Sequence, residues 1–153
     1  MDLTDYEAID RLGGVIAERW GKLDIFVGNA GILGPISPVA HMKPDEFEKT
    51  LAVNVTANAR LIRALEPLLL ASDNGRAVFL TSGAAYSTKA FWGAYSTSKA
   101  ALDALVKSWA KEQKNTALKI NLYSPGPVRT AMRAQAMPGA VSYTHLRAHE
   151  TSE

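Results

Sequence analysis

A tyrosine and a lysine stand four residues apart in the stretch GAYSTSKAALDAL, which covers Gly93 to Leu105. Helical periodicity places Tyr95 and Lys99 on one face, one turn apart. A free phenol, with a pKa of about 10, holds its proton too firmly to exchange it easily near neutrality. A neighbouring ammonium favours the phenolate and can lower that pKa by about a unit or more. The spacing is therefore compatible with acid–base chemistry, although an exposed pair of this kind usually has no function.

The elements that must position this pair alternate between strands and helices. Three short apolar runs predict buried strands, and three longer segments with helical periodicity predict helices. We expect the strands within 23–31, 76–82 and 118–126, and the helices within 6–20, 44–70 and 93–114. Gly13 and Gly14 lie inside the first helix and weaken that prediction. The alternation favours an α/β fold, a parallel sheet with helices on both faces.

Each predicted strand ends in a polar or glycine-rich stretch. These stretches read NAG, TSGAA and SPGPVRT along the chain. Sheets of this kind bind ligands at the carboxyl ends of their strands. One such stretch is explained by a short loop, but three together indicate the rim of one crevice.

Asn54 interrupts the apolar stripe of the long helix predicted over 44–70. A buried amide must find hydrogen-bond partners, so Asn54 is either a local staple of the backbone or part of a polar site. Taken alone, the staple is the better interpretation.

Composition limits the classes of function. With 153 residues, 47% of them hydrophobic, the chain can form one domain with a core. A net charge of +2, with scattered basic residues, argues against a nucleic-acid partner. The absence of cysteine excludes disulfides and thiolate metal sites. Nothing resembles a signal peptide or reaches membrane-spanning length, so we expect a cytoplasmic protein without a membrane partner.

Five motifs occur in an order that resembles the short-chain dehydrogenase/reductase family. They are NAG after the first strand, NVT in the long helix, TSGAA after the second strand, YSTSK thirteen positions beyond Ser82, and PGPVRT. The resemblance covers Asp2 to about Gly139. It implies a partial Rossmann-type, doubly wound parallel sheet over 1–140, with three strands and flanking helices. It also implies an oxidoreductase that interconverts a carbonyl and a secondary alcohol with NAD or NADP, as a homodimer or homotetramer.

The resemblance assigns a role to each motif residue. Tyr95 becomes the catalytic acid/base, Lys99 its activator, Ser82 the hydroxyl that orients the substrate oxygen, and Asn54 a relay that connects Lys99 to solvent through a bound water. The cofactor contacts that it implies are Asp2, Asn29, Ala30, Gly31, Tyr95, Lys99, Pro125, Gly126, Val128 and Thr130.

The sequence departs from the family at its beginning. The family's glycine-rich turn TGxxxGxG, which holds the cofactor pyrophosphate at a helix N-terminus, has no counterpart here. We therefore expect the chain to be an internal part of a longer enzyme. Two alternatives stay open: a chain that is inactive as it stands, and an NAD-dependent epimerase or isomerase.

The end of the sequence departs from the family as well. Residues 141–153 fit no expected element, and 141–151 resemble a translated sequencing adapter, which predicts a non-native or disordered tail over 141–153. His145 and His149 stand four apart but lack a third ligand, so we expect no metal site. Nearer the motifs, Trp92 is either a substrate contact or a packing residue, and we expect Arg129 and Arg133 on a solvated face.

Overall fold

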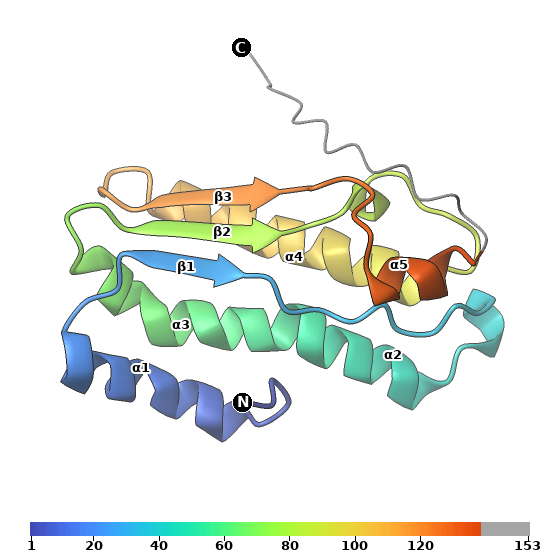
Figure 1. Cartoon of the computed structure of the whole chain (residues 1–153), viewed down its shortest axis with the longest axis horizontal. Helices are drawn as coiled ribbons and strands as arrows, with labels where there is room; N and C mark the ends of the chain where they lie inside the picture. The colour runs from blue at the N-terminus through green and yellow to red at the C-terminus, as the bar shows by residue number, and fades with distance from the viewer. Residues whose placement is uncertain (139–153) are drawn as a thin grey trace, which may run out of the picture.

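The computed structural model describes residues 1–138 as alternating helices and parallel strands (Figure 1). In chain order the elements are α1 (Tyr6–Trp20), β1 (Ile25–Gly28), the 3₁₀ turn η1 (Val39–His41), α2 (Pro44–Leu51), the π-helix η2 (Ala52–Thr56), α3 (Ala57–Leu70), β2 (Arg76–Leu80), the 3₁₀ turn η3 (Gly83–Ala85), α4 (Gly93–Glu112), β3 (Lys119–Tyr123) and α5 (Ala131–Ala136). This order confirms the α/β fold and the partial Rossmann-type sheet of three strands with flanking helices.

The sheet brings the ends of its strands to one edge. Its order is β1-β2-β3, and both pairs of neighbours are parallel. The register aligns Val27 with Val78 and Val78 with Asn121. All three strands therefore finish at the same edge, on the side where α5 lies in Figure 1, and the three polar stretches follow from there.

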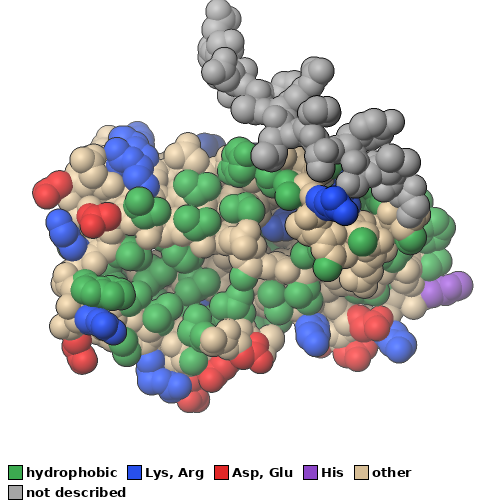
Figure 2. Space-filling view, in the orientation of Figure 1, with side chains coloured by type: hydrophobic (Ala, Val, Ile, Leu, Met, Phe, Trp, Pro, Cys, Tyr) green, Lys and Arg blue, Asp and Glu red, His purple; other side chains and the backbone are tan. Residues whose placement is uncertain are grey.

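The burial pattern corrects the expectation that helices cover both faces of the sheet. Within residues 1–138, α1, α3 and α4 share one core with alternate side chains of the strands, which include Phe26, Phe79 and Leu122. The intervening positions point away from that core, and Ile25 and Val27 are 65% and 53% exposed. Figure 2 shows hydrophobic side chains gathered over this uncovered face. The apolar character of the run around β1 predicted burial on both faces, but the described part of the chain covers only one.

The core holds the end of β1 close to β2. Phe79 is fully buried and packs edge-on against Phe26 and Trp109, with ring centroids 5.4 and 6.2 Å away. A Cβ at Gly28 would lie 2.5 Å from the Phe79 ring. The last residue of β1 must therefore be small for its neighbour to pack, and this contact places the Asn29 stretch beside β2.

The long helix predicted over 44–70 is confirmed as one helical rod, but it is not regular. Between α2 and α3 lies the π-helix, in which the backbone N–H of Ala57 donates to the carbonyl of Ala52. Asn54 sits at the centre of this segment and is fully buried. Single π turns inside α-helices occur frequently at functional sites, because they re-aim the side chains around them.

Some predictions fall outside this description. The tail predicted over 141–153, with His145 and His149, lies outside the described residues. Among the helices that the structure describes, none is both long and apolar enough to cross a lipid bilayer.

Candidate functional site

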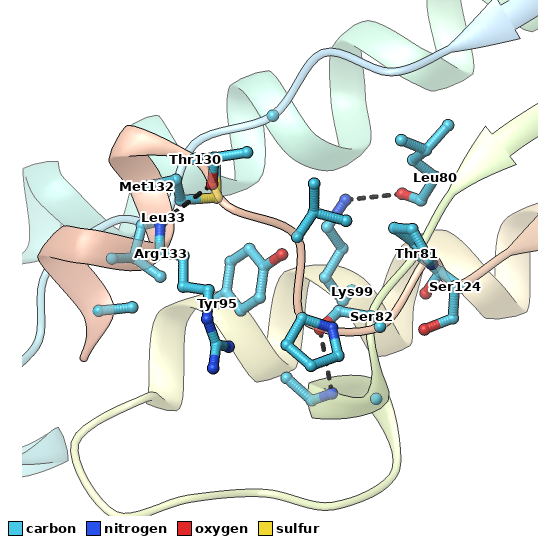
Figure 3. Close-up of a pocket in the computed structure, with 18 of the residues that line it drawn as sticks. Leu33, Leu80, Thr81, Ser82, Tyr95, Lys99, Ser124, Thr130, Met132 and Arg133 are labelled. Carbon is cyan, nitrogen blue, oxygen red and sulfur yellow. Dashed lines mark hydrogen bonds between the residues drawn. The ribbon is translucent and has the colours of Figure 1, made fainter. Parts of the chain in front are cut away.

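A cavity of about 790 Å³ opens at the carboxyl ends of the three strands (Figure 3). Its walls come from the loops after β1, β2 and β3, from the first turns of α4 and from α5. Most of the residues assigned to the site from the sequence line it: Asn29, Ala30, Gly31, Ser82, Tyr95, Lys99, Pro125, Gly126, Val128 and Thr130. The structure therefore brings together three stretches that are distant in sequence.

Tyr95 presents its phenol to the cavity from the first turn of α4. It is buried, and its ring packs edge-on against Trp92 with the centroids 6.0 Å apart. Burial raises the pKa of the Tyr95 phenol above its ordinary value of 10.0, and the nearby Ser82 hydroxyl, a hydrogen-bond partner, acts in the opposite direction. The phenol is therefore protonated at neutral pH in this structure.

Lys99 reaches the cavity one helical turn further along α4. Its Nζ donates to the backbone carbonyl of Leu80, 2.8 Å away, at the end of β2. Figure 3 shows this ammonium and the Tyr95 hydroxyl directed into the same space. Burial lowers the pKa of Lys99, while the charge of Asp103 opposes that shift. Lys99 is thus a desolvated cation with a fixed position.

The expectation that Lys99 lowers the pKa of Tyr95 is not met in this structure. The Lys99 Nζ lies 5.8 Å from the centre of the Tyr95 ring, tied to Leu80. Desolvation is the dominant influence on both groups, and it disfavours the charged form of each. Helical spacing predicts that the two side chains share a face, but it does not include the cost of burying them.

Asn54 lies behind the cavity wall and does not line it. Its Oδ1 accepts from the Ile32 backbone N–H at 2.8 Å, and its Nδ2 donates to the Ile32 carbonyl at 2.8 Å and to the Ser98 hydroxyl at 2.9 Å. Ser98 in turn donates to the Tyr95 carbonyl at 2.8 Å. These bonds make Asn54 a staple of the backbone, but not the local one expected, because they tie the loop after β1, 22 residues away, to the helix that carries Tyr95.

The backbone at Gly31 passes close to the side chains of both Asn54 and Lys99. A Cβ at this position would lie 3.3 Å from the Asn54 Oδ1 and 3.6 Å from the Lys99 Nζ. The absence of a side chain leaves room beside the ammonium, and that room belongs to the cavity.

A buried carboxylate supports the cavity from below, and sequence reasoning missed it. Asp103 accepts hydrogen bonds from the hydroxyls of Thr81 and Tyr86, and Lys107 lies 4.0 Å from its carboxylate. Thr81 directly precedes Ser82, so these bonds hold the start of that loop. A signal was present, because Asp103 follows Lys99 by four residues on the same helical face.

Asp2 is not brought to the cavity. It is exposed, and its carboxylate accepts from the backbone N–H and the hydroxyl of Thr4, both at 2.8 Å. These bonds lower the pKa of Asp2. The adenine contact predicted for this residue stays a prediction.

Two further side chains line the cavity: Trp92, for which the sequence left a substrate contact and packing open, and Arg133. Trp92 contacts both the cavity and Tyr95, so it packs and is also available to a ligand. Arg133, expected on a solvated face, is half-buried and extends from α5 into the cavity wall, whereas Arg129 is exposed and lies outside the lining. The path of the chain after β3 therefore decides that Arg133, and not Arg129, reaches the cavity.

Comparison with known proteins finds a matching family and relatives that are named as oxidoreductases or reductases. The sequence model of the family described as short chain dehydrogenase matches residues 1–140. The chain is 39% identical over 132 residues to the uncharacterized oxidoreductase YciK of Escherichia coli K12, which covers 86% of this chain and 52% of that protein. It is 38% identical over 109 residues to an NADPH-dependent aldehyde reductase-like chloroplast protein of Arabidopsis thaliana, with coverage of 71% and 40%.

A solved structure shows the same fold. A putative short chain dehydrogenase of Escherichia coli CFT073, crystallised in complex with NADPH, superposes with a TM-score of 0.86 at 38% identity. The alignment covers 91% of this chain and 58% of that one. The chain thus spans about half the length of the relatives that it matches.

Proposed function

This chain belongs to the short chain dehydrogenase family, and from that premise we propose that it carries the catalytic residues of an oxidoreductase. The enzyme would interconvert a carbonyl group and a secondary alcohol with NAD or NADP. One observation carries the proposal: Ser82, from the loop after β2, and Tyr95 and Lys99, from α4, line a single cavity at the carboxyl ends of the strands.

Tyr95 acts as the proton donor in carbonyl reduction. A carbonyl carbon that accepts a hydride leaves an alkoxide, and this oxygen takes the phenolic proton as it forms. The raised pKa of Tyr95 ensures that the proton is present at neutral pH before the reaction. The Ser82 hydroxyl donates a hydrogen bond to the same substrate oxygen and orients it without adding charge. In the reverse direction the tyrosinate would accept the proton of the alcohol.

Lys99 stabilises the phenolate that remains after proton transfer. Its ammonium is buried and held by Leu80, so it meets the new negative charge in a site of low polarity, where the attraction is strong. The same burial makes Lys99 ready to release a proton, since its pKa is lowered. Lys99 can therefore return a proton to Tyr95 between turnovers.

The residues around Lys99 fit a nicotinamide cofactor. Its Nζ has three N–H donors, of which one is used within residues 1–138, and Gly31 leaves open the space next to it. Asn29, Ala30, Gly31, Lys99, Pro125, Gly126, Val128 and Thr130 would hold the nicotinamide half. When bound, the cofactor supplies or accepts the hydride. The NADPH complex of the similar structure and the name of the Arabidopsis relative favour NADPH for a first assay.

Asn54 enters the proposal chiefly as a positioning residue. Both of its Nδ2 hydrogens are engaged by Ile32 and Ser98, so it fixes the loop that carries Gly31 against α4. A water-mediated relay from Asn54 to Lys99 stays a prediction, as do a homodimer or homotetramer and a cytoplasmic location.

The test follows NADPH-dependent reduction of ketones to secondary alcohols by the purified protein, together with NADPH binding. Tyr95→Phe keeps the ring and removes the proton, and should lower turnover by about 100-fold or more while NADPH binding persists. Tyr6→Phe is the matched control, because Tyr6 of α1 packs under Arg60 of α3, outside the cavity lining. Near-normal turnover by Tyr95→Phe would contradict the mechanism. A native chain that neither binds NADPH nor reduces any ketone would favour the alternative of an inactive chain.

A further inference from the structure

The cavity extends beyond the catalytic residues into a second region with apolar walls. This outer region is formed by the loop before α4 and by α5, which face each other across the Tyr95 ring. Leu33 is buried and packs with Tyr95 in one small cluster, to which Trp92, Met132 and Ala136 contribute. These walls suit the hydrocarbon body of a ligand.

The charges of the cavity all have one sign. Three cationic side chains line it, Lys89, Lys99 and Arg133, and among its described lining residues none is an aspartate or a glutamate. Within residues 1–138 neither Lys89 nor Arg133 forms an ion pair. The nearest buried carboxylate, Asp103, lies outside the lining and is occupied by Thr81 and Tyr86.

Lys89 and Arg133 belong to the outer region. The Lys89 Nζ lies 5.2 Å from the centre of the Trp92 ring, a cation–π distance that keeps the ammonium over this wall. Arg133 is half-buried, and its backbone N–H is capped by the Thr130 hydroxyl at 3.1 Å, which anchors the first turn of α5. A guanidinium beside apolar walls is less screened by water than one on an open surface, so it attracts an anion more strongly.

We infer that the outer region binds an anionic group of the substrate, and that the substrate is a carbonyl compound whose apolar body carries a carboxylate or a phosphate. This inference rests on the proposed function, since Ser82 and Tyr95 would receive the carbonyl oxygen. Arg133 offers a planar set of donors that matches either anion in two-point contact, and Lys89 adds a second positive charge. The net positive cavity would also raise the rate at which such substrates arrive.

The experiment compares three ketones of similar shape: para-acetylbenzoate, para-acetylphenyl phosphate and the neutral methyl para-acetylbenzoate. Binding to the full chain is measured by ligand-observed NMR, and NADPH-dependent reduction is measured in parallel. We expect the native chain to favour one or both anions over the neutral ester, with a preference that falls as salt is added. The carboxylate and phosphate arms identify which anion is preferred.

Three variants locate the preference. Arg133→Leu should reduce the anion-to-neutral binding ratio about tenfold, which corresponds to loss of one charge-assisted contact. Arg133→Lys keeps the charge and should retain most of the preference. Arg129→Leu removes an equal charge just outside the cavity and should leave the ratio unchanged.

The outcomes separate this inference from the proposed function. The anion site is overturned if the anion-to-neutral binding ratio is the same in the native chain and in Arg133→Leu. It is also overturned if Arg129→Leu reduces this ratio as much as Arg133→Leu does. The anion site is also overturned if Arg133→Leu weakens NADPH binding but leaves aromatic anion binding unchanged, since the cation would then serve the cofactor. If the anion preference is present but no ketone is reduced, the anion site is supported and the proposed catalysis fails.

Discussion

Two adjacent glycines in α1 offer a sharp test of how the helices pack. Gly13 is buried, and a Cβ added there would lie 2.4 Å from the carbonyl oxygen of Ala64 in α3. Gly14 is exposed, and a Cβ there would meet nothing within 4 Å. Each is replaced by alanine. The two variants differ by one position in the same helix, so each serves as the control for the other.

The expected difference follows from these contacts. Gly to Ala inside a helix stabilises by about 0.8–1 kcal/mol through helix propensity, and this gain is common to both variants. Gly13→Ala must also push α1 away from α3 by about 1 Å to restore an ordinary contact of 3.4 Å. Overpacking of this kind costs about 1–3 kcal/mol. The free energy of unfolding of Gly14→Ala should therefore exceed that of the native chain. That of Gly13→Ala should lie about 1–3 kcal/mol below that of Gly14→Ala.

Urea unfolding followed by circular dichroism measures both free energies of unfolding. An unchanged m-value would show that the midpoint reports stability and not the compactness of the unfolded state. Equal stability of the two variants within about 0.5 kcal/mol would refute the close approach of α1 and α3, because the propensity term cancels between them.

Three further predictions concern the site. Asn54→Ala should lower the free energy of unfolding by about 2–4 kcal/mol, because it leaves the Ile32 N–H and carbonyl without partners. The control, Asn115→Ala at an exposed position, should change it by under about 0.5 kcal/mol. Equal effects of the two substitutions in urea unfolding would contradict the role of Asn54 as a staple. The difference in tyrosinate absorbance between the native chain and Tyr95→Phe should titrate above pH 10.0, and a titration below it would show that Lys99 outweighs burial. Lys99 has a lowered pKa when folded, so the unfolded chain binds more protons between that pKa and 10.5. Relative to Lys99→Met, the native chain should therefore gain stability as pH rises through that window, and a difference independent of pH in thermal melts would exclude the effect.

Much of the fold was accessible from sequence because it depends on local patterns. The three apolar runs, each closed by a polar stretch, predicted the strands and the edge at which they meet. The helix over 44–70 was accessible for the same reason, but its π turn was not. That irregularity accompanies the non-local bonds of Asn54 to Ile32 and Ser98, which are 22 and 44 residues away.

The site was accessible only in part. Ser82, Tyr95 and Lys99 stand out because their types and spacing resemble a known pattern, and the structure places them at one cavity. Arg133 could not be separated from Arg129 by sequence, since both are arginines that follow the predicted third strand and stand only four residues apart. Which of them enters the cavity depends on the direction of the chain after β3, and no local periodicity encodes it.

The sequence by itself determined the order of strands and helices, the family and the residues that can exchange a proton, because these depend on residue types and on short spacings. The tertiary structure alone decided which face of the sheet is covered, which cations line the cavity, and that burial raises the pKa of Tyr95 and lowers that of Lys99. The reason is physical: desolvation, packing and the sum of charges in a cavity depend on atoms that are distant in sequence and meet only when the chain is folded.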